Sequence, residues 1–121
     1  MMWDFNSEKP VYIQIMDEIK ARIISGAYQA GQRMPSVREL AEEARVNPNT
    51  MQKALSETER QGLIFSMRTS GKYITNDEQK IAELKSNTAK KECEVFISKM
   101  LKLGFSKDVI PTIISDIIHN M

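Results

Sequence analysis

The segment from residue 34 to residue 71 constrains the fold of this chain most, because it contains residues typical of helix N-termini at two positions. Ser36 is followed three residues later by Glu39, which predicts a capping box at the start of a helix. Asn47 is a good N-cap, and Pro48 stands at the first helical position, where its missing N–H costs nothing. The sequence therefore predicts two short helices joined by a tight turn at Arg45 and Val46.

A hairpin is predicted directly after the second helix. Gly62 is placed to end that helix. Residues 63–66 and 72–75 can then pair as strands around a turn at 67–71. A helix-turn-helix followed by such a hairpin, or wing, lays its second helix in the DNA major groove with a backbone clamp beside it.

Helical spacing separates a buried face from an exposed face in both short helices. In the first helix the residues expected to face inward are Val37, Leu40, Ala41 and Ala44, and the small alanines let a second helix cross closely. In the second helix the inward residues are Met51, Ala54, Leu55 and Thr58, which leaves Asn49, Thr50, Gln52 and Lys53 free to point elsewhere.

Three further helices are predicted outside this segment. An apolar stripe at every fourth residue predicts a helix over 11–25, ended by Gly26. A long helix is expected over 77–103, with a local bend at residues 86–88 and a stop at Gly104. Ser106 with Asp108 is expected to open the last helix, in which Pro111 implies either a kink or a true start at Pro111.

Bulk properties narrow the class of protein. The 121 residues allow one domain with a small appendage, and the net charge is only +1, so a nucleic-acid footprint must be local. Residues 45–72 contain five basic and two acidic side chains, so the excess of positive charge lies on the second helix of the helix-turn-helix and on the wing. A single cysteine, Cys93, leaves no internal disulfide and no cysteine-based metal cage. With no secretory signal and no long apolar run, the sequence indicates a soluble cytoplasmic protein that does not engage a membrane.

A longer run of residues resembles a known family. The matching stretches are Pro10-Val-Tyr-Ile-Gln14, Gly26-Ala-Tyr28, Gly31-Gln-Arg-Met-Pro35-Ser-Val-Arg38-Glu-Leu-Ala41, Val46-Asn-Pro-Asn-Thr50 and Gly62-Leu-Ile64. Together they resemble the GntR family of bacterial transcription regulators, and the short two-helix tail is similar to the YtrA subfamily. The resemblance implies a mainly α fold with a small β-hairpin, made of a winged helix-turn-helix DNA-binding domain over residues 9–77 and a helical dimerisation segment over residues 78–121.

The resemblance also implies roles for residues. Arg38 resembles the family arginine that reaches DNA, and the recognition-helix and wing-tip positions fall on polar residues that can contact base edges or phosphates. Gln52 and Pro48 depart from many relatives, so no base preference is carried over. The candidate DNA-binding residues are Ser36, Arg38, Asn47, Asn49, Thr50, Gln52, Lys53, Arg68, Thr69 and Gly71.

The tail of the sequence carries more apolar surface than a monomer would leave exposed. The residues expected at a dimer interface are Val95, Phe96, Met100, Ile110, Ile113, Ile114, Ile117 and Ile118. Two-fold symmetry predicts a palindromic DNA operator for the homodimer. The resemblance implies a repressor whose target is often its own operon, commonly one encoding an ABC transporter, and a small-molecule effector at the dimer interface stays open.

Other functions fit the residues less well. A winged helix that binds proteins would need an apolar or acidic reading face, and a ligand-gated activator would usually carry a larger effector domain. An enzyme is not expected, because His119 is the only histidine and the sequence offers no catalytic triad, metal cluster or phosphate-binding loop. No cofactor is expected either. Two plainer interpretations also stand: Arg38 could simply pair with Glu42, and His119 and Cys93 could be ordinary surface residues.

Overall fold

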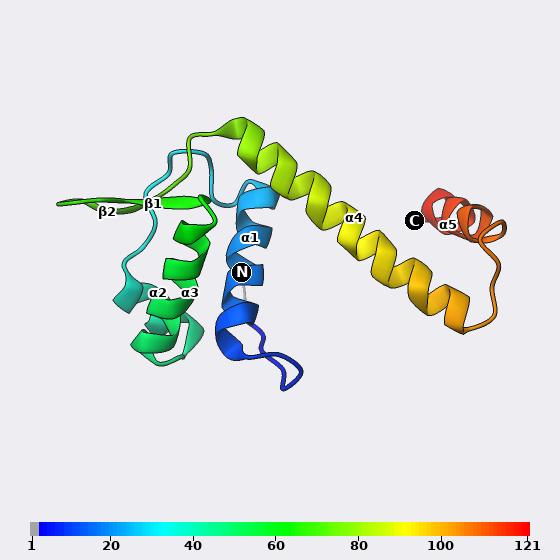
Figure 1. Cartoon of the computed structure of the whole chain (residues 1–121), viewed down its shortest axis with the longest axis horizontal. Coiled ribbons are helices and arrows are strands. Elements are labelled where there is room, and N and C mark those ends of the chain that lie inside the picture. Colours follow the sequence, from blue (N-terminus) through cyan, green and yellow to red (C-terminus); the bar gives the residue numbers. More distant parts are fainter. Residues whose placement is uncertain (1–2) are drawn as a thin grey trace. The chain divides into compact units, whose positions relative to one another are not determined.

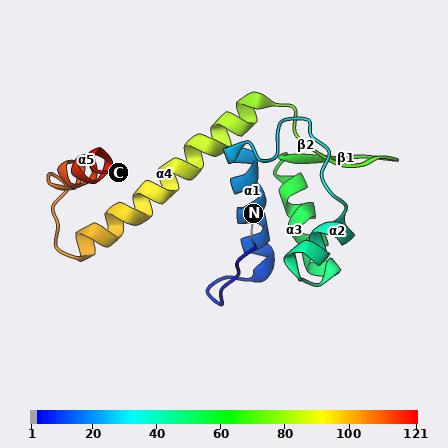
Figure 2. The same ribbon diagram turned by 180° about the vertical axis from the view of Figure 1, so that it is seen from behind.

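The computed structural model describes residues 3–121, which form five helices and one two-stranded sheet (Figures 1 and 2). These residues divide into two compact units, one ending at Leu84 and the other beginning at Lys85. The element order confirms the predicted fold class, a winged helix-turn-helix followed by a helical segment. Among the described residues, no helix has both the length and the apolar character needed to cross a membrane.

Helix α1 (Val11–Ser25) confirms the predicted bounds and forms the base of the first unit. Its stripe of Ile15, Ile19 and Ile23 is buried in the hydrophobic core, where α1 lies beside α3 (Figures 1 and 2). Gly26 ends the helix in the left-handed conformation at φ 84°, which a glycine adopts without steric cost.

Helices α2 (Val37–Ala44) and α3 (Pro48–Arg60) form the helix-turn-helix. The capping box is present, since the Glu39 N–H donates to Ser36 Oγ at 3.1 Å and the Ser36 N–H donates to Glu39 Oε1 at 3.0 Å. The predicted inward residues are buried except Val37, which is half-buried at the edge of the core. The buried set is Leu40, Ala41, Ala44, Met51, Ala54, Leu55 and Thr58.

Strands β1 (Ile64–Met67) and β2 (Gly71–Ile74) form the wing, each lying one residue closer to the turn than predicted. They pair antiparallel with Ile64 opposite Ile74. The loop between α1 and α2 joins β2 through one isolated bridge, between Arg33 and Tyr73. At this bridge the Met34 N–H donates to the Lys72 carbonyl and the Ile74 N–H donates to the Gln32 carbonyl, both at 2.8 Å.

A buried arginine joins the N-terminal segment, α1 and α2. Arg22 on α1 is 4% exposed and bonds Glu18 at 3.1 Å, the Tyr28 hydroxyl at 3.0 Å and Glu43 on α2 at 3.3 Å. The Trp3 ring lies 4.3 Å from its guanidinium carbon, and the Trp3 indole N–H donates to Glu43. This cluster fixes the N-terminal segment and α2 against α1.

Helix α4 (Glu78–Lys102) begins in the first unit and continues into the second. Its early residues Ile81 and Leu84 pack against the hydrophobic core. The predicted bend at residues 86–88 is wrong, because the helix runs through them without interruption. Weak helix formers in a row do not break a helix that strong formers flank on both sides.

Helix α5 (Ile110–His119) begins later than Ser106 and Asp108 suggested. Residues 107–109 form a turn, and Pro111 stands within the first two helical positions. Proline is tolerated there because those backbone N–H groups have no partner in the helix. Of the two alternatives that Pro111 left open, the structure shows the start and not the kink.

Candidate functional site

The first two turns of α3 present a polar surface to solvent. Asn49, Gln52 and Lys53 are exposed and Thr50 is half-buried. The Asn49 N–H donates to Asn47 Oδ1 at 2.7 Å, so the cap of the helix uses the side-chain oxygen of Asn47 as its acceptor. The helix N-terminus and the amide side chains therefore lie on one accessible surface, which suits contacts to phosphates and base edges.

Two of these side chains have contacts within the chain. Gln52 Nε2 donates to Ser56 Oγ at 3.0 Å, one turn along the exposed side of α3. Lys53 Nζ lies 4.0 Å from the centre of the Tyr12 ring on α1, an arrangement that favours a cation. The charge of Lys53 is thereby drawn toward α1, whereas Gln52 keeps its amide oxygen for a further hydrogen bond.

Arg38 on α2 forms the ion pair that the sequence offered as its plainer role. Its Nε lies 3.4 Å from Glu42 Oε1, with the two side chains 88% and 70% exposed. An exposed pair of this kind contributes at most about 1 kcal/mol. The contact therefore does not prevent Arg38 from turning to a phosphate.

The wing carries three candidates at its tip. Arg68 and Thr69 are exposed in the turn between the strands, and Gly71 begins β2 at φ 114°. A Cβ at residue 71 would meet Arg33 Nε at 3.5 Å, which is an ordinary van der Waals contact. The positive φ of residue 71, and not the neighbouring arginine, therefore favours glycine at this position.

An ion pair connects the wing to the recognition helix. Lys72 Nζ lies 2.8 Å from Glu59 Oε1 and also donates to Ser66 Oγ at 3.0 Å. The hydrogen bond from Lys72, with a further one from Ser66, lowers the pKa of the Glu59 carboxyl below its ordinary value. These contacts hold β1 and β2 against the C-terminal half of α3.

Ion pairs leave the net charge of residues 45–72 unchanged but show which side chains carry the positive excess. Arg60 pairs with Glu57 at 2.8 Å, so Arg60 and Lys72 are both largely neutralised. Within residues 3–121, Arg33, Arg45 and Arg68 take part in no ion pair. The charge count from residue 45 onward missed Arg33, although its place just before the capped helix was a signal that could have found it.

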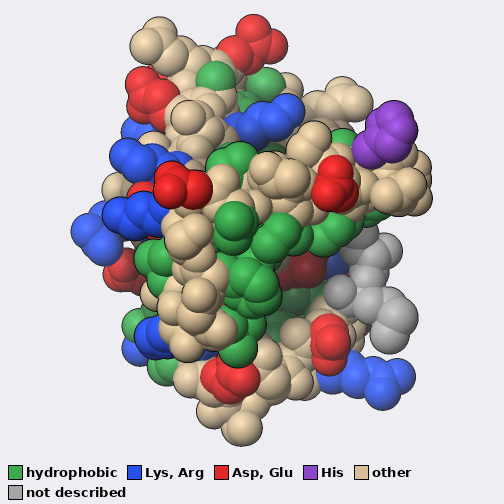
Figure 3. Space-filling view, turned by 90° about the vertical axis from the view of Figure 1, so that its right-hand side faces the viewer, with side chains coloured by type: hydrophobic (Ala, Val, Ile, Leu, Met, Phe, Trp, Pro, Cys, Tyr) green, Lys and Arg blue, Asp and Glu red, His purple; other side chains and the backbone are tan. Residues whose placement is uncertain are grey.

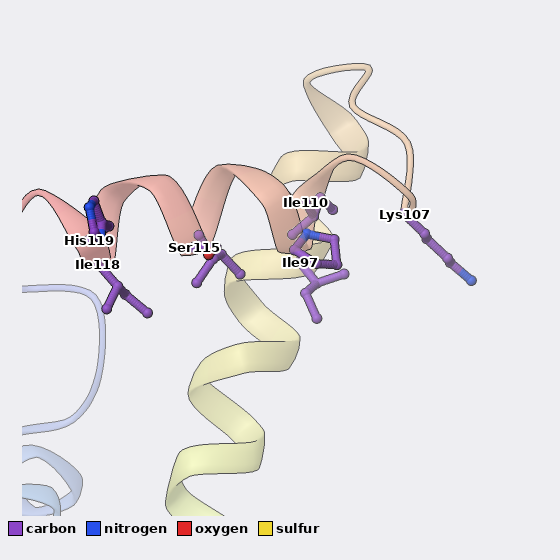
Figure 4. A pocket seen from close by; sticks show the side chains of 8 residues that line it. Ile97, Lys107, Ile110, Ser115, Ile118 and His119 are labelled. Atoms are coloured by element: carbon purple, nitrogen blue, oxygen red, sulfur yellow. The ribbon is translucent and has the colours of Figure 1, made fainter.

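The second unit has an apolar surface. The candidate interface residues Val95, Phe96, Ile117 and Ile118 are exposed, Met100, Ile113 and Ile114 are half-buried, and Ile110 is buried within this chain. A groove of about 800 Å³ lies between α4 and α5, and its apolar lining includes Ile97, Ile110, Ile114 and Ile118 (Figure 4). Ser115, Lys107 and His119 are the polar residues around it, and hydrophobic side chains also reach the surface in Figure 3.

Comparison with known proteins identifies the first unit. Residues 11–74 match the family model described as bacterial regulatory proteins, gntR family. The chain is 38% identical over 104 residues to the uncharacterized HTH-type transcriptional regulator YhcF of Bacillus subtilis, covering 86% of each. It is 42% identical over 74 residues to the HTH-type transcriptional repressor YtrA of the same organism, covering 61% of this chain and 57% of YtrA.

Solved structures of similar proteins support the same family assignment. A GntR family transcriptional regulator from Listeria monocytogenes matches with a TM-score of 0.86 and 42% identity, over 93% of this chain and 98% of that one. The AraR DNA-binding domain in complex with operator ORX1 matches with a TM-score of 0.56 and 26% identity, over 62% of this chain and 99% of that one. The family model covers more than half of the chain. The chain therefore belongs to the GntR family, whose members are DNA-binding transcription regulators and not enzymes.

Proposed function

We propose that the protein is a homodimeric repressor that binds a palindromic operator, with the start of α3 reading bases and the wing contacting the backbone. The observation that carries the proposal is the exposed polar surface at the start of α3, which in the sequence stands between the exposed Arg38 on α2 and the exposed Arg68 in the turn of the wing. Amides, hydroxyls and exposed arginines match the edges of bases and the charge of phosphates. A protein-binding winged helix would instead expose apolar or acidic residues there.

The candidate residues divide by chemistry. Asn49 and Gln52 carry amides that can pair with an adenine edge, and Asn47 adds its own amide beside them. The other candidates are suited to the sugar–phosphate backbone, through charge, hydroxyl groups or close approach of the main chain. These backbone candidates are Ser36, Arg38, Thr50, Lys53, Arg68, Thr69 and Gly71.

The second unit is the proposed dimer contact. Its exposed apolar residues and the groove beside them form a surface that a second copy of the chain would cover. Val95, Phe96, Ile117 and Ile118 are free to enter such a contact, whereas Ile110 supports the groove from within the chain. A two-fold dimer then presents two recognition helices to two half-sites, which is why the operator is proposed to be palindromic.

Regulation is proposed from the relatives. The repressor YtrA supports repression, and the AraR domain on its operator supports a double-stranded DNA target. The resemblance to the YtrA subfamily supports the protein's own operon, encoding an ABC transporter, as that target. Such a regulator acts in the bacterial cytoplasm at the nucleoid, and a small effector would bind in or beside the groove of the second unit.

Selection of duplexes from a random DNA pool tests the proposal. The purified full chain should enrich an inverted repeat, because each half-site would be read by one protomer of a symmetric dimer. Light scattering of the protein on one selected duplex should give the mass of two chains plus that of the duplex. Enrichment of a single unrepeated site would contradict the palindrome, and the absence of any enriched sequence would contradict specific reading by α3.

A further inference from the structure

The turn between α2 and α3 contains a backbone conformation that its residue disfavours. Arg45 has φ 57° and ψ 46°, in the left-handed region. Among residues 3–121 it is the one non-glycine residue with positive φ, and glycines occupy the other such positions. L-residues pay a steric cost in this region because Cβ approaches the following carbonyl, whereas glycine does not.

The turn itself does not need the arginine side chain. The Arg45 N–H donates to the carbonyls of Ala41 and Glu42, and the Val46 N–H donates to the Ala41 carbonyl at 3.0 Å. This is the Schellman ending of a helix, and every one of these hydrogen bonds comes from the main chain. A glycine at residue 45 would keep all of them and remove the steric cost.

The Arg45 side chain also gains nothing that offsets this cost within the fold. It is exposed, and no ion pair in the described part of the chain includes it. The nearby carboxylate of Glu42 is already paired with Arg38. A residue kept in a disfavoured conformation without an internal benefit points to a role in binding.

We propose that the Arg45 guanidinium binds a phosphate of the DNA backbone next to the start of the recognition helix, and that this interaction is why the turn carries an arginine. Arg45 stands two residues before the α3 cap, and Arg38, Arg45 and Pro48 border one shallow hollow between α2 and the start of α3. The two arginines outnumber Glu42, the acid in that hollow. The inference rests on the proposed DNA-binding surface and adds a residue to it.

Arg45→Gly tests the proposal because its two expected effects have opposite signs. The melting temperature of the free protein should rise by about 2–6 °C, since the steric cost is removed. Affinity for operator and for random duplexes should fall by a similar factor of about 5–10 per half-site, and the slope of log affinity against log salt should decrease by about 0.9 for each phosphate that is no longer neutralised. Arg45→Lys keeps the charge and should retain most of the affinity.

Two controls separate this proposal from the proposed function. Lys90→Gln removes a positive charge from the exposed middle of α4 and should leave both readouts unchanged. Arg38→Ala should weaken DNA binding whether or not Arg45 contributes.

The outcomes are distinct. If Arg45→Gly raises the melting temperature but binds DNA as the parent does while Arg38→Ala weakens binding, the Arg45 interaction is refuted and the DNA-binding surface stands. A lower melting temperature for Arg45→Gly would also refute the proposal, because the side chain would then be structural. If the parent itself showed no salt-dependent DNA binding, the proposed function would fail together with it.

Discussion

The two units of this chain differ in where their apolar residues lie. The first unit has a closed core, in which Ile15, Leu40 and Leu55 are each 0% exposed. The second unit leaves Ile117 56% exposed and Ile118 63% exposed, and α4 has no buried residue at all. The first unit therefore holds its fold with its own core, whereas the second has an apolar surface without a complement inside the chain.

This difference separates two sources of stability. A core that closes within one chain gives an unfolding free energy that does not depend on protein concentration. An apolar surface completed by a second copy gives a stability that rises with concentration, because association is linked to folding. If the second unit is the dimer contact, the two units should respond differently to mutation and to dilution.

The largest expected effect breaks the proposed dimer contact. Changing Ile114 and Ile117 together to aspartate would place four carboxylates in one dimer interface, and the effective penalty of burying an unpaired charge is several kcal/mol each. Light scattering should then report monomers at concentrations where the parent is dimeric. Thr112→Asp, on an exposed part of α5, is the matched control. A stable dimer after the double change would place the interface elsewhere.

The next largest effect is expected in the core of the first unit. Leu55→Ala removes a fully buried side chain of α3 and should lower the unfolding free energy by about 2–5 kcal/mol. Urea denaturation followed by circular dichroism measures this loss, which should be the same at high and low protein concentration. Val95→Ala, at an exposed position of α4, should change the stability of dilute protein by about 0.5 kcal/mol or less. Equal losses for the two variants would contradict the contrast between the units.

A smaller effect separates base reading from backbone contact. Asn49→Ala should cost about 1–3 kcal/mol on the operator and much less on random DNA, because an amide can pair with a base edge. Arg68→Ala should weaken both DNAs to a similar degree, because a phosphate is the same in every sequence. Titration of each variant against operator and scrambled duplexes decides the matter, after circular dichroism shows an unchanged fold. Equal losses on both DNAs for Asn49→Ala would remove Asn49 from the base-reading residues.

The smallest effect concerns the pair that holds the wing. The pKa of Glu59 in the folded protein lies below its ordinary value of 4.5, so the pair with Lys72 stabilises the fold above that pH and stops doing so as the pH falls through the lowered pKa. Both side chains are partly exposed, so the contribution should be at most about 1 kcal/mol. Glu59→Gln should therefore lower stability at pH 7 and leave it unchanged near pH 2, as followed by thermal unfolding. Glu83→Gln, on exposed α4 surface, should show no such dependence.

Local signals predicted most of the first unit. Caps and stops at Ser36, Asn47 and Gly62 act within three or four residues of the chain, and the structure confirms each of them. The strand bounds moved by one residue because the end of α3 and the start of the wing share Leu63, whose N–H donates to Thr58 and whose carbonyl accepts from Thr75. The boundary depends on whether a residue forms the hydrogen bonds of the helix end or those of the strand, and the periodicity of apolar residues does not distinguish the two.

Features that depend on distant residues were not predictable. Arg22 reads as a solvent-facing charge on α1, and only the folded chain brings Trp3 and Glu43 to it. The strain at Arg45 and the place of Arg33 beside Gly71 likewise arise from backbone geometry. The DNA-binding roles of the exposed residues remain predictions, which the Asn49 and Arg68 variants test.

The uninterrupted passage of α4 through its polar middle has a consequence for how this sequence can change over time. None of the side chains of residues 85–94 is buried, so many different amino acids can replace them without changing the helix, provided that they favour a helix. Insertions and deletions act differently, because each added or deleted residue turns the rest of a helix by about 100° and shifts it by about 1.5 Å. Substitutions in residues 85–94 should therefore be tolerated during evolution far more readily than insertions or deletions.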